Sequence, residues 1–370
     1  MAQRKKVWLD CDPGHDDAIA LLMGLYLPQI DLIGVSTART LLLYPPQRAA
    51  HPPQVFGNTN ATDTYQNAVR LLHAFAAPAH VTAFPGAVKP LIRVARIDAE
   101  IHGAHGLGGT EGLAPFEHPE VQKRVHAAGG KGAVEAMAAA FSAVEGKLTI
   151  VSTGPMTNSA ALFSAFPHLV GKVEQIVFMG GGVGLGNRSP VAEYNILCDP
   201  EAAQIVFDLP VPKVMVPLNV THTAIFDEDA VTQLVTRAHP SAHKVQLSSV
   251  PTSPLRHTLY TLIHFFASTY KAVFNFDGPP IHDAVAMVYV AHPELFEAKR
   301  YRVDVELAGL HTAGETVVDL WDYRKCDDTW GPTGKNVLLT EKLDVPKFID
   351  LFLECVDKAD KVSPLNAHKT

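Results

Sequence analysis

Short apolar segments recur along this chain of 370 residues, and each is followed by a loop and then by a helical pattern. They lie at residues 7–9, 32–37, 148–153, 175–180 and 214–220. Strand-length apolar segments that alternate with helices are typical of βαβ units, in which neighbouring strands run parallel. The pattern therefore predicts an α/β fold with an open, mostly parallel mixed sheet flanked by helices, in a single domain over residues 1–370.

Two features complete the predicted architecture. Alternating residues in 300–308 and 315–321 favour additional strands, and residues 345–362 have a helical pattern that we expect to close the fold. In folds of this kind ligands bind beyond the carboxyl ends of the strands, where the strand order reverses. The loops that follow the predicted strands are therefore where we expect a site.

The charge balance argues against nucleic acid as a ligand. The chain has 31 Lys and Arg against 38 Asp and Glu, a net charge of −7, whereas nucleic-acid-binding domains carry a basic excess. No apolar run reaches the roughly 18 residues of a membrane span, and the start, MAQRKKVWLDCDPG, lacks the apolar core of a signal peptide. We expect a cytoplasmic protein, with a nuclear location also compatible, and neither a membrane nor a nucleic-acid partner.

The cysteines predict reduced thiols. Cys11, Cys198, Cys326 and Cys355 are widely spaced and form no CxxC pair. This spacing matches neither a disulfide framework nor a zinc ribbon. With 47% hydrophobic residues the chain has enough apolar material for a substantial core.

Two segments interrupt the βαβ pattern. Residues 38–55, ARTLLLYPPQRAAHPPQV, contain two Pro-Pro pairs and no Asp or Glu, and the flanking sequence continues smoothly without them. They are interpreted either as a surface insertion loop or as translated intron sequence. Residues 100–132 are rich in Gly and His, and we expect a mobile loop there, although an ordinary connector would have the same composition.

An acidic cluster follows the first predicted strand. Asp10, Asp12, Asp16 and Asp17 fall within eight residues, and the only nearby basic side chain is His15. Carboxylates this close raise one another's pKa or need a counter-charge. A bound Ca²⁺ or Mg²⁺ is the simplest solution, because hard cations prefer carboxylate oxygens. The alternative, acids that stabilise the start of a helix, accounts for Asp16 and Asp17 only.

A D-x-D sequence after a strand also has another interpretation. Phosphatases of the haloacid dehalogenase type place D-x-D at this position and use the first Asp, here Asp10, as a nucleophile. The longer sequence DCDPGHDDAIA at 10–20 is more specific than D-x-D alone.

The longer motif resembles the N-terminal signature of the inosine-uridine-preferring nucleoside hydrolase family. Further motifs of that family stand in the same order: STGPMTNSAAL at 152–162, VFMGGGVGLGNRSPVAEYNILCDPEAA at 177–203, VPLNVTH at 216–222 and GPPIHDAVA at 278–286. Within the family, WLDCDPGHDDAIA, FGN and GPPIHD are most similar to fungal uridine nucleosidases (uridine ribohydrolases). The resemblance covers nearly the whole chain and implies the Rossmann-like fold of that family.

The resemblance implies hydrolysis of the N-glycosidic bond of ribonucleosides with bound Ca²⁺, giving ribose and free base. The residues that match its metal ligands are Asp12, Asp17, Thr153 (through its backbone carbonyl) and Asp283. Asp12 would also act as the general base toward a water on the metal. Asp10 would orient these groups without touching the ion.

The resemblance also implies the substrate contacts. The residues that match ribose-binding positions are Asp16, Asn58, Met179, Asn187, Glu193 and Asn195. His282 matches the family's candidate acid for the leaving base, and His102 matches a second histidine with that role in pyrimidine-preferring members. Tyr270 matches an aromatic residue near the base, with Phe266 and Phe274 one helical turn to either side.

Several points remain open at this stage. The resemblance implies a homodimer or homotetramer, a uridine preference among uridine, cytidine, purine nucleosides and nicotinamide riboside, and either His102 or His282 as the acid. The competing functions are the phosphatase with Asp10 as nucleophile and a nucleoside-binding protein that has lost catalysis.

Overall fold

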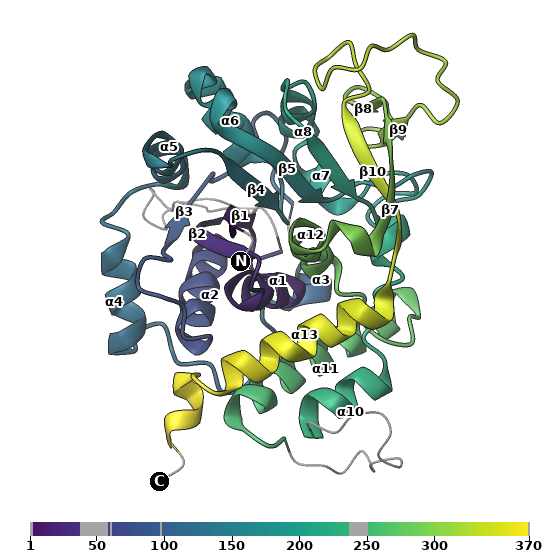
Figure 1. The fold of residues 1–370 in the computed structure, drawn as a ribbon. Helices are drawn as coiled ribbons and strands as arrows, with labels where there is room; N and C mark the ends of the chain where they lie inside the picture. The colour runs from purple at the N-terminus through teal and green to yellow at the C-terminus, as the bar shows by residue number, and fades with distance from the viewer. Residues whose placement is uncertain (1–2, 38–57, 60, 97, 237–250, 369–370) are drawn as a thin grey trace, which may run out of the picture.

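A central sheet with helices on both faces organises the chain (Figure 1). The computed structural model describes residues 3–37, 58–59, 61–96, 98–236 and 251–368. In these ranges the main sheet has eight strands, in the spatial order β3 (Ala83–Pro85), β2 (Ile30–Thr37), β1 (Lys5–Cys11), β4 (Leu148–Ser152), β5 (Val173–Met179), β6 (Lys213–Val216), β10 (Val337–Leu343) and β7 (Phe296–Tyr301). Neighbouring strands pair in parallel except β10 and β7, which are antiparallel. The predicted α/β fold with a mostly parallel mixed sheet is confirmed.

Side chains of the central strands alternate between two cores. In β1, Val7 and Leu9 belong to one buried cluster and Trp8 to the other, as expected when successive residues of a strand point to opposite faces. Gly34 on β2 makes room for the Trp8 ring, because a Cβ there would lie 2.6 Å from Trp8 Cζ3. The Trp8 Nε1–H donates to Ser36 Oγ (3.0 Å), which satisfies the one polar atom of the ring.

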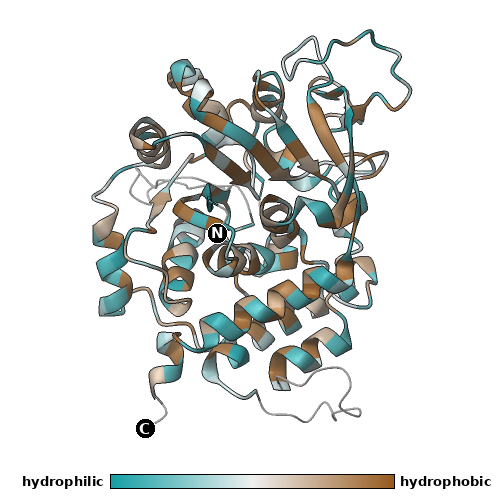
Figure 2. Ribbon diagram, in the orientation of Figure 1, coloured by the Kyte–Doolittle hydropathy of each residue, from teal (hydrophilic) through white to brown (hydrophobic). Residues whose placement is uncertain are grey.

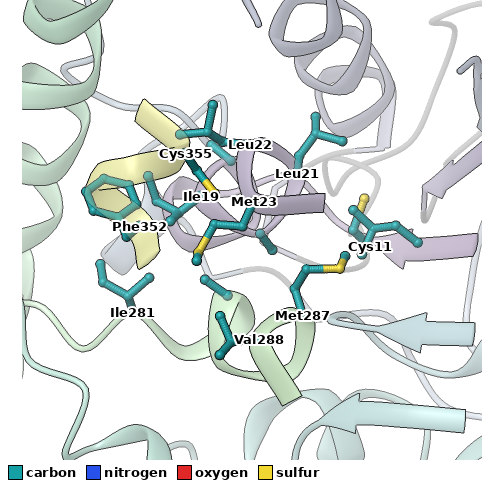
Figure 3. Packing of buried hydrophobic residues seen from close by; sticks show 14 of the residues in the cluster. Cys11, Ile19, Leu21, Leu22, Met23, Ile281, Met287, Val288, Phe352 and Cys355 are labelled. Carbon is teal, nitrogen blue, oxygen red and sulfur yellow. The ribbon is translucent and has the colours of Figure 1, made fainter. Parts of the chain in front are cut away.

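Each face of the sheet is covered by its own helices (Figure 1). One face packs against α1 (His15–Tyr26), α2 (Ala61–Ala74) and α12 (His282–Ala291), with α13 (Val345–Asp360) outside them. The other face packs against α5 (Ala133–Ala143), α6 (Thr157–Ala165), η1 (Pro167–Lys172) and α8 (Pro200–Phe207). Figure 3 shows Met23 of α1, Met287 of α12 and Phe352 of α13 in one buried cluster.

The predicted C-terminal helix is α13. Its buried residues, Phe348, Phe352, Cys355, Val356 and Ala359, follow the spacing of an amphipathic helix, and hydrophobic and hydrophilic residues alternate along it in Figure 2. Asp344 caps its start by accepting from the Lys347 N–H (3.2 Å).

The remaining elements surround the carboxyl end of the sheet or lie at its periphery. They are α3 (Ala99–His102), α4 (Pro119–Ala127), α7 (Tyr194–Cys198), α9 (Leu218–Thr221), α10 (Glu228–Thr236), α11 (Pro254–Phe274), η2 (Pro293–Leu295), η3 (Pro364–His368), and the two-stranded sheet of β8 (Val303–Val305) and β9 (Thr316–Val318). None of the described helices is long and apolar enough to span a membrane.

One sequence prediction differs from the structure in detail, and two others are not tested by it. The predicted strand at 214–220 ends at Val216, because residues 218–221 form the short helix α9. Residues 100–132 include the end of α3 and all of α4, and their mobility stays a prediction. Residues 38–55 lie outside the described residues.

Candidate active site

The candidate site lies where the strand order reverses. β1 is followed along the chain by β2 on one side, whereas its other neighbour, β4, continues to β5 and β6. At this point the carboxyl end of β1 leads into α1, and the end of β4 leads to Thr153. The two loops diverge there and leave a crevice, as expected for a ligand site of a parallel sheet.

Three buried carboxylates meet at this crevice. One oxygen each of Asp16, Asp17 and Asp283 lies within 4.8 Å of the others. Asp16 and Asp17 come from the first turn of α1, and Asp283 comes from the first turn of α12. Helices α1 and α12 are held together by the core in Figure 3, so the packing of two apolar helices brings the acids to one point.

Asp12, also fully buried, lies beside this trio and is held by the residue expected to bind ribose. Its Oδ2 accepts from the backbone N–H of Asn58 (2.8 Å), and its carbonyl accepts from Asn58 Nδ2 (3.1 Å). The same Nδ2 donates to Asp17 Oδ2 (2.9 Å). The compact group is thus Asp16, Asp17 and Asp283, with Asp12 adjacent, and Asn58 bridges Asp12 and Asp17.

Two carboxylate oxygens at the crevice lack partners. Asp12 Oδ1 and Asp16 Oδ1 are buried without a hydrogen bond among the described residues. By contrast, Asp17 accepts from the Gly14 N–H (2.9 Å) and from Thr153 Oγ1 (2.8 Å). Buried oxygens without donors are costly, and unpaired oxygens beside three clustered acids fit a bound cation.

The pKa values of these acids agree with that interpretation. Burial, followed by the charge of Asp17, raises the pKa of Asp16 to about 8. Burial and neighbouring carboxylates also raise the pKa of Asp12 and of Asp283 well above the usual range. Ionising the whole group at neutral pH therefore requires a compensating positive charge.

Asp10 stands behind the site. It is 2% exposed, and its Oδ1 accepts from Ser36 Oγ (2.6 Å) and Asn158 Nδ2 (2.8 Å). Its carbonyl accepts from the Thr153 N–H (2.8 Å), which ties the ends of β1 and β4 together. Burial raises its pKa to about 6. These contacts suit an orienting role and leave Asp10 poorly placed to attack a phosphate.

The Thr153 carbonyl accepts a hydrogen bond that was not predicted from the sequence. Asn195 Nδ2 donates to Thr153 O (2.9 Å) and to Met179 O (3.2 Å). A carbonyl oxygen has two lone pairs, so one remains for a cation. Asn195 therefore joins the ends of β4 and β5 at the floor of the pocket.

Polar residues in and before α7 form one wall. Glu193 caps this helix by accepting from the N–H groups of Asn195 (2.8 Å) and Ile196 (3.2 Å), and it also accepts from the Gly181 N–H (2.9 Å). Burial, opposed by these bonds, raises the pKa of Glu193 to about 7. Asn187 Oδ1 accepts from the Tyr194 N–H (2.9 Å), and none of the described residues forms a hydrogen bond with its amide nitrogen.

Another part of the lining consists of two histidines and aromatic residues. His282 contacts Thr221 Oγ1 through Nδ1 (2.7 Å) and Tyr270 Oη through Nε2 (2.8 Å). Tyr270 packs against Phe266 and Phe274, with ring centroids 4.8 and 5.3 Å away. Burial lowers the pKa of both His282 and His102 well below the usual range.

The pocket enclosed by these walls has about 420 Å³ of empty space, part of which is open solvent. Eleven of the predicted site residues line it: Asp16, Asn58, His102, Thr153, Met179, Asn187, Glu193, Asn195, Tyr270, His282 and Asp283. Asp12 and Asp17 lie beneath it and are 0% exposed.

An ion pair at the pocket was not predicted from the sequence. Arg188 pairs with Asp98 and lies 3.4 Å from Glu100, and its guanidinium lies over the Phe274 ring (5.5 Å). Both Asp98 and Arg188 line the pocket. Arg188 directly follows Asn187, which is the one local signal that could have indicated it.

Comparisons with known proteins identify the family. Residues 53–350 match the model of the inosine-uridine preferring nucleoside hydrolases. The chain is 34% identical over 352 residues to a pyrimidine-specific ribonucleoside hydrolase, RihA, of Shewanella sp. (strain MR-7), a match that covers 95% of each protein. It is 32% identical over 360 residues to a probable ribonucleoside hydrolase of Dictyostelium discoideum, which covers 95% of this chain and 94% of that protein.

A solved structure agrees with this family assignment. The plant nucleoside hydrolase PpNRh1 superimposes with a TM-score of 0.76 at 28% identity, over 95% of this chain and 98% of that one. The chain belongs to the inosine-uridine preferring nucleoside hydrolase family. It is therefore an enzyme, an N-glycosyl hydrolase that acts on ribonucleosides.

Proposed function

We propose that this enzyme is a Ca²⁺-dependent pyrimidine ribonucleoside hydrolase that prefers uridine and releases ribose and free base. The observation that carries the proposal is the group of buried carboxylates with unpaired oxygens, directly beneath a pocket lined by amide and carboxylate side chains. The relative named as pyrimidine-specific supports the choice of base. We further propose that it works in the cytoplasm as a homodimer or homotetramer.

Asp12, Asp17, Asp283 and the Thr153 carbonyl would hold the ion. An oxygen-only set of this kind suits Ca²⁺, and Mg²⁺ is the nearest alternative. Asp16 would lie beside the ion and bind a ribose hydroxyl with its unpaired Oδ1. A bound Ca²⁺ supplies positive charge that keeps the carboxylates ionised and makes a nearby water more acidic.

Hydrolysis then needs a base on one side of the anomeric carbon and an acid on the other. Asp12 takes a proton from the attacking water, whose oxygen bonds to C1′, while the C1′–N bond breaks and its electron pair stays on the leaving base. Positive charge develops on the ribose as this bond breaks. Asp16 and Glu193 line the pocket and would place negative charge beside the sugar, which stabilises that state more than the ground state.

Two histidines are suited to protonating the leaving base. His282 already has partners at both ring nitrogens, so it would act through the Tyr270 hydroxyl. His102 lines the pocket, and its Nε2 has no hydrogen bond among the described residues. We propose that His102 protonates the base directly and that His282 orients and polarises Tyr270 against it.

The remaining pocket residues would recognise the ribose. Asn195 and Asn58 lie next to the carboxylates and would contact the 2′- and 3′-hydroxyls, whereas Asn187 and Glu193 would hold the 5′-hydroxyl. Met179 at the end of β5 would pack against the sugar ring.

A substrate panel tests the proposal. Release of ribose is measured from uridine, cytidine and inosine, and release of phosphate from p-nitrophenyl phosphate, with wild-type enzyme and the variants Asp12→Ala and Asp229→Ala. Asp229 is an exposed acid on α10 and serves as the matched control. We expect ribose release to be faster from uridine than from cytidine or inosine. Turnover should fall by roughly 10³-fold in Asp12→Ala and should not change in Asp229→Ala.

Other outcomes separate the alternatives. Phosphate release that depends on Asp10 would establish a phosphatase. Uridine binding without ribose release would establish a protein that has lost catalysis, and faster turnover of inosine would refute the pyrimidine preference.

A further inference from the structure

His15 has no role in the mechanism proposed above, although it contacts His102 of the pocket. It is the first residue of α1, 0% exposed, and it stacks against the rings of Phe265 and Phe266 at centroid distances of 5.2 and 5.3 Å. The planes of these rings are inclined to His15 by only 10° and 3°. Stacking of this kind fixes the plane of the imidazole, and therefore the directions of its two nitrogens.

One nitrogen of His15 is a hydrogen-bond donor. Its Nε2 lies 2.9 Å from the Gly108 carbonyl oxygen, and because a carbonyl only accepts, Nε2 carries the proton. Gly108 itself is held against Phe265, since a Cβ on it would lie 2.6 Å from Phe265 Cζ. In a neutral ring the other nitrogen, Nδ1, is then unprotonated and acts as an acceptor.

That acceptor faces His102. The two Nδ1 atoms are 3.3 Å apart, so a hydrogen bond between them requires the proton to be on His102. The backbone N–H of His15 also lies 3.4 Å from His102 Nδ1, and a bond there would require the opposite tautomer. Both contacts are long. The bond from the backbone N–H, however, would leave the unprotonated Nδ1 atoms of His15 and His102 facing each other.

We propose that His15 is a positioning residue that keeps the proton of neutral His102 on Nδ1. The inference rests on the proposed function, in which His102 protonates the departing base. With Nδ1 already protonated, Nε2 takes up a proton from solvent to form the imidazolium, gives that proton to the departing base and returns to the neutral ring. With the opposite tautomer Nε2 would hold the only proton of the neutral ring, and donating it would leave an imidazolate anion, which is far less stable. His15 thus acts on His102 as an orienting partner acts on a catalytic histidine.

Two substitutions separate this role from a packing role. In His15→Asn the side-chain oxygen lies near the position of Nδ1, so an acceptor for His102 remains while the Gly108 bond is lost. In His15→Gln the amide reaches the position of Nε2, so the Gly108 bond remains while the Nδ1 acceptor is lost. Both variants lose the stacked imidazole, and each is therefore the control for the other.

Long-range ¹H–¹⁵N spectra of ¹⁵N-histidine-labelled, Ca²⁺-supplemented enzyme report which nitrogen of His102 is protonated, with the resonance assigned by His102→Gln. We expect the proton on Nδ1 in the wild type and in His15→Asn, and on Nε2 in a substantial fraction of His15→Gln. With uridine we expect kcat to fall by roughly 10- to 100-fold in His15→Gln with KM within about threefold, and by less than about fivefold in His15→Asn.

Three results would overturn the proposal. They are a proton on Nε2 of His102 in the wild type, a tautomer that does not change in His15→Gln, or equal losses of kcat and thermal stability in both variants. A wild-type enzyme that hydrolyses no ribonucleoside would instead refute the proposed function, and the tautomer measurement would still decide what His15 does to His102.

Discussion

Gly154 lies so close to Asp12 that a Cβ at position 154 would be 2.6 Å from Asp12 Oδ1 and 3.0 Å from its Cγ. Asp12 Oδ1 is one of the two unpaired oxygens at the crevice, and it belongs to the proposed general base. The first residue after Thr153 therefore has to be small for the carboxylate to keep its position.

Gly154→Ala should displace the Asp12 carboxylate without removing any polar group. We expect kcat/KM for uridine to fall by roughly 10- to 100-fold and the Ca²⁺ concentration for half-maximal activity to rise. Losses of this size are usual when a residue that orients a metal ligand is changed. Gly171→Ala is the matched control, because nothing lies within 4 Å of a Cβ at that position. Equal activity of the two variants would show that Asp12 is not held by this contact.

Chelation should make stability depend on pH in a defined direction. The folded-state pKa of Asp16 is raised to about 8 from 3.8, so the metal-free native state keeps a proton that the unfolded chain has already lost. The free energy of unfolding therefore falls as pH rises from about 4 to about 8, and added Ca²⁺ removes this loss. Thermal unfolding at pH 5 and pH 8, with EDTA or Ca²⁺, measures it.

Asp16→Asn should flatten that pH dependence, whereas Asp229→Asn should leave it unchanged. A chelated wild-type enzyme with the same or a higher Tm at pH 8 than at pH 5 would contradict the raised pKa values.

Removal of the 2′-hydroxyl should abolish most turnover. Asp16, Asn58 and Asn195 are buried polar side chains, and with 2′-deoxyuridine the groups built for the missing hydroxyl would be left unpaired. A loss in kcat/KM on the order of 10⁴-fold relative to uridine is expected for such a site. Initial rates of base release from the two nucleosides test this, and a difference of only a few-fold would contradict the assigned ribose contacts.

His282 and Tyr270 should behave as one unit. Because Tyr270 Oη lies 2.8 Å from His282 Nε2, Tyr270→Phe and His282→Gln interrupt the same hydrogen-bonded pair. We expect each to lower kcat by roughly 10-fold and the double variant to be hardly worse than either single one. His102→Gln combined with Tyr270→Phe should instead give nearly multiplicative losses, and multiplicative losses in the first pair would separate His282 from Tyr270.

The sequence predicted the frame of the molecule because that frame is periodic. Apolar runs such as 148–153 and 175–180 became β4 and β5 within a few residues, and the helical spacing of 345–362 became α13. The strand predicted at 214–220 was too long, since a local pattern cannot distinguish the end of β6 from the apolar turn of α9 that follows it.

The site residues were predicted from motifs, whereas the hydrogen bonds that connect them were not. Thr153 and Asn195 were both chosen from the sequence, but their hydrogen bond joins the ends of β4 and β5 and depends on the assembled sheet. The contacts of Arg188 and His15 were not predicted because their partners, Asp98 and His102, are 90 and 87 residues away. Single charged or aromatic residues carry no periodic signal for such contacts.

The two interpretations of residues 38–55 make opposite predictions. If they are translated intron sequence, peptides of the native protein do not contain them, and deleting them raises uridine hydrolysis. If they are a genuine insertion, mass spectrometry finds these peptides and the deletion brings no gain.

The most direct test of the central claim is ribose release from uridine by enzyme stripped of metal with a chelator and then titrated with Ca²⁺. We predict that the stripped enzyme loses at least about 10³-fold in kcat/KM, that Ca²⁺ restores wild-type activity, and that Asp12→Ala stays inactive at every Ca²⁺ concentration. Full activity of the stripped enzyme, or restoration of Asp12→Ala by Ca²⁺, would contradict the account.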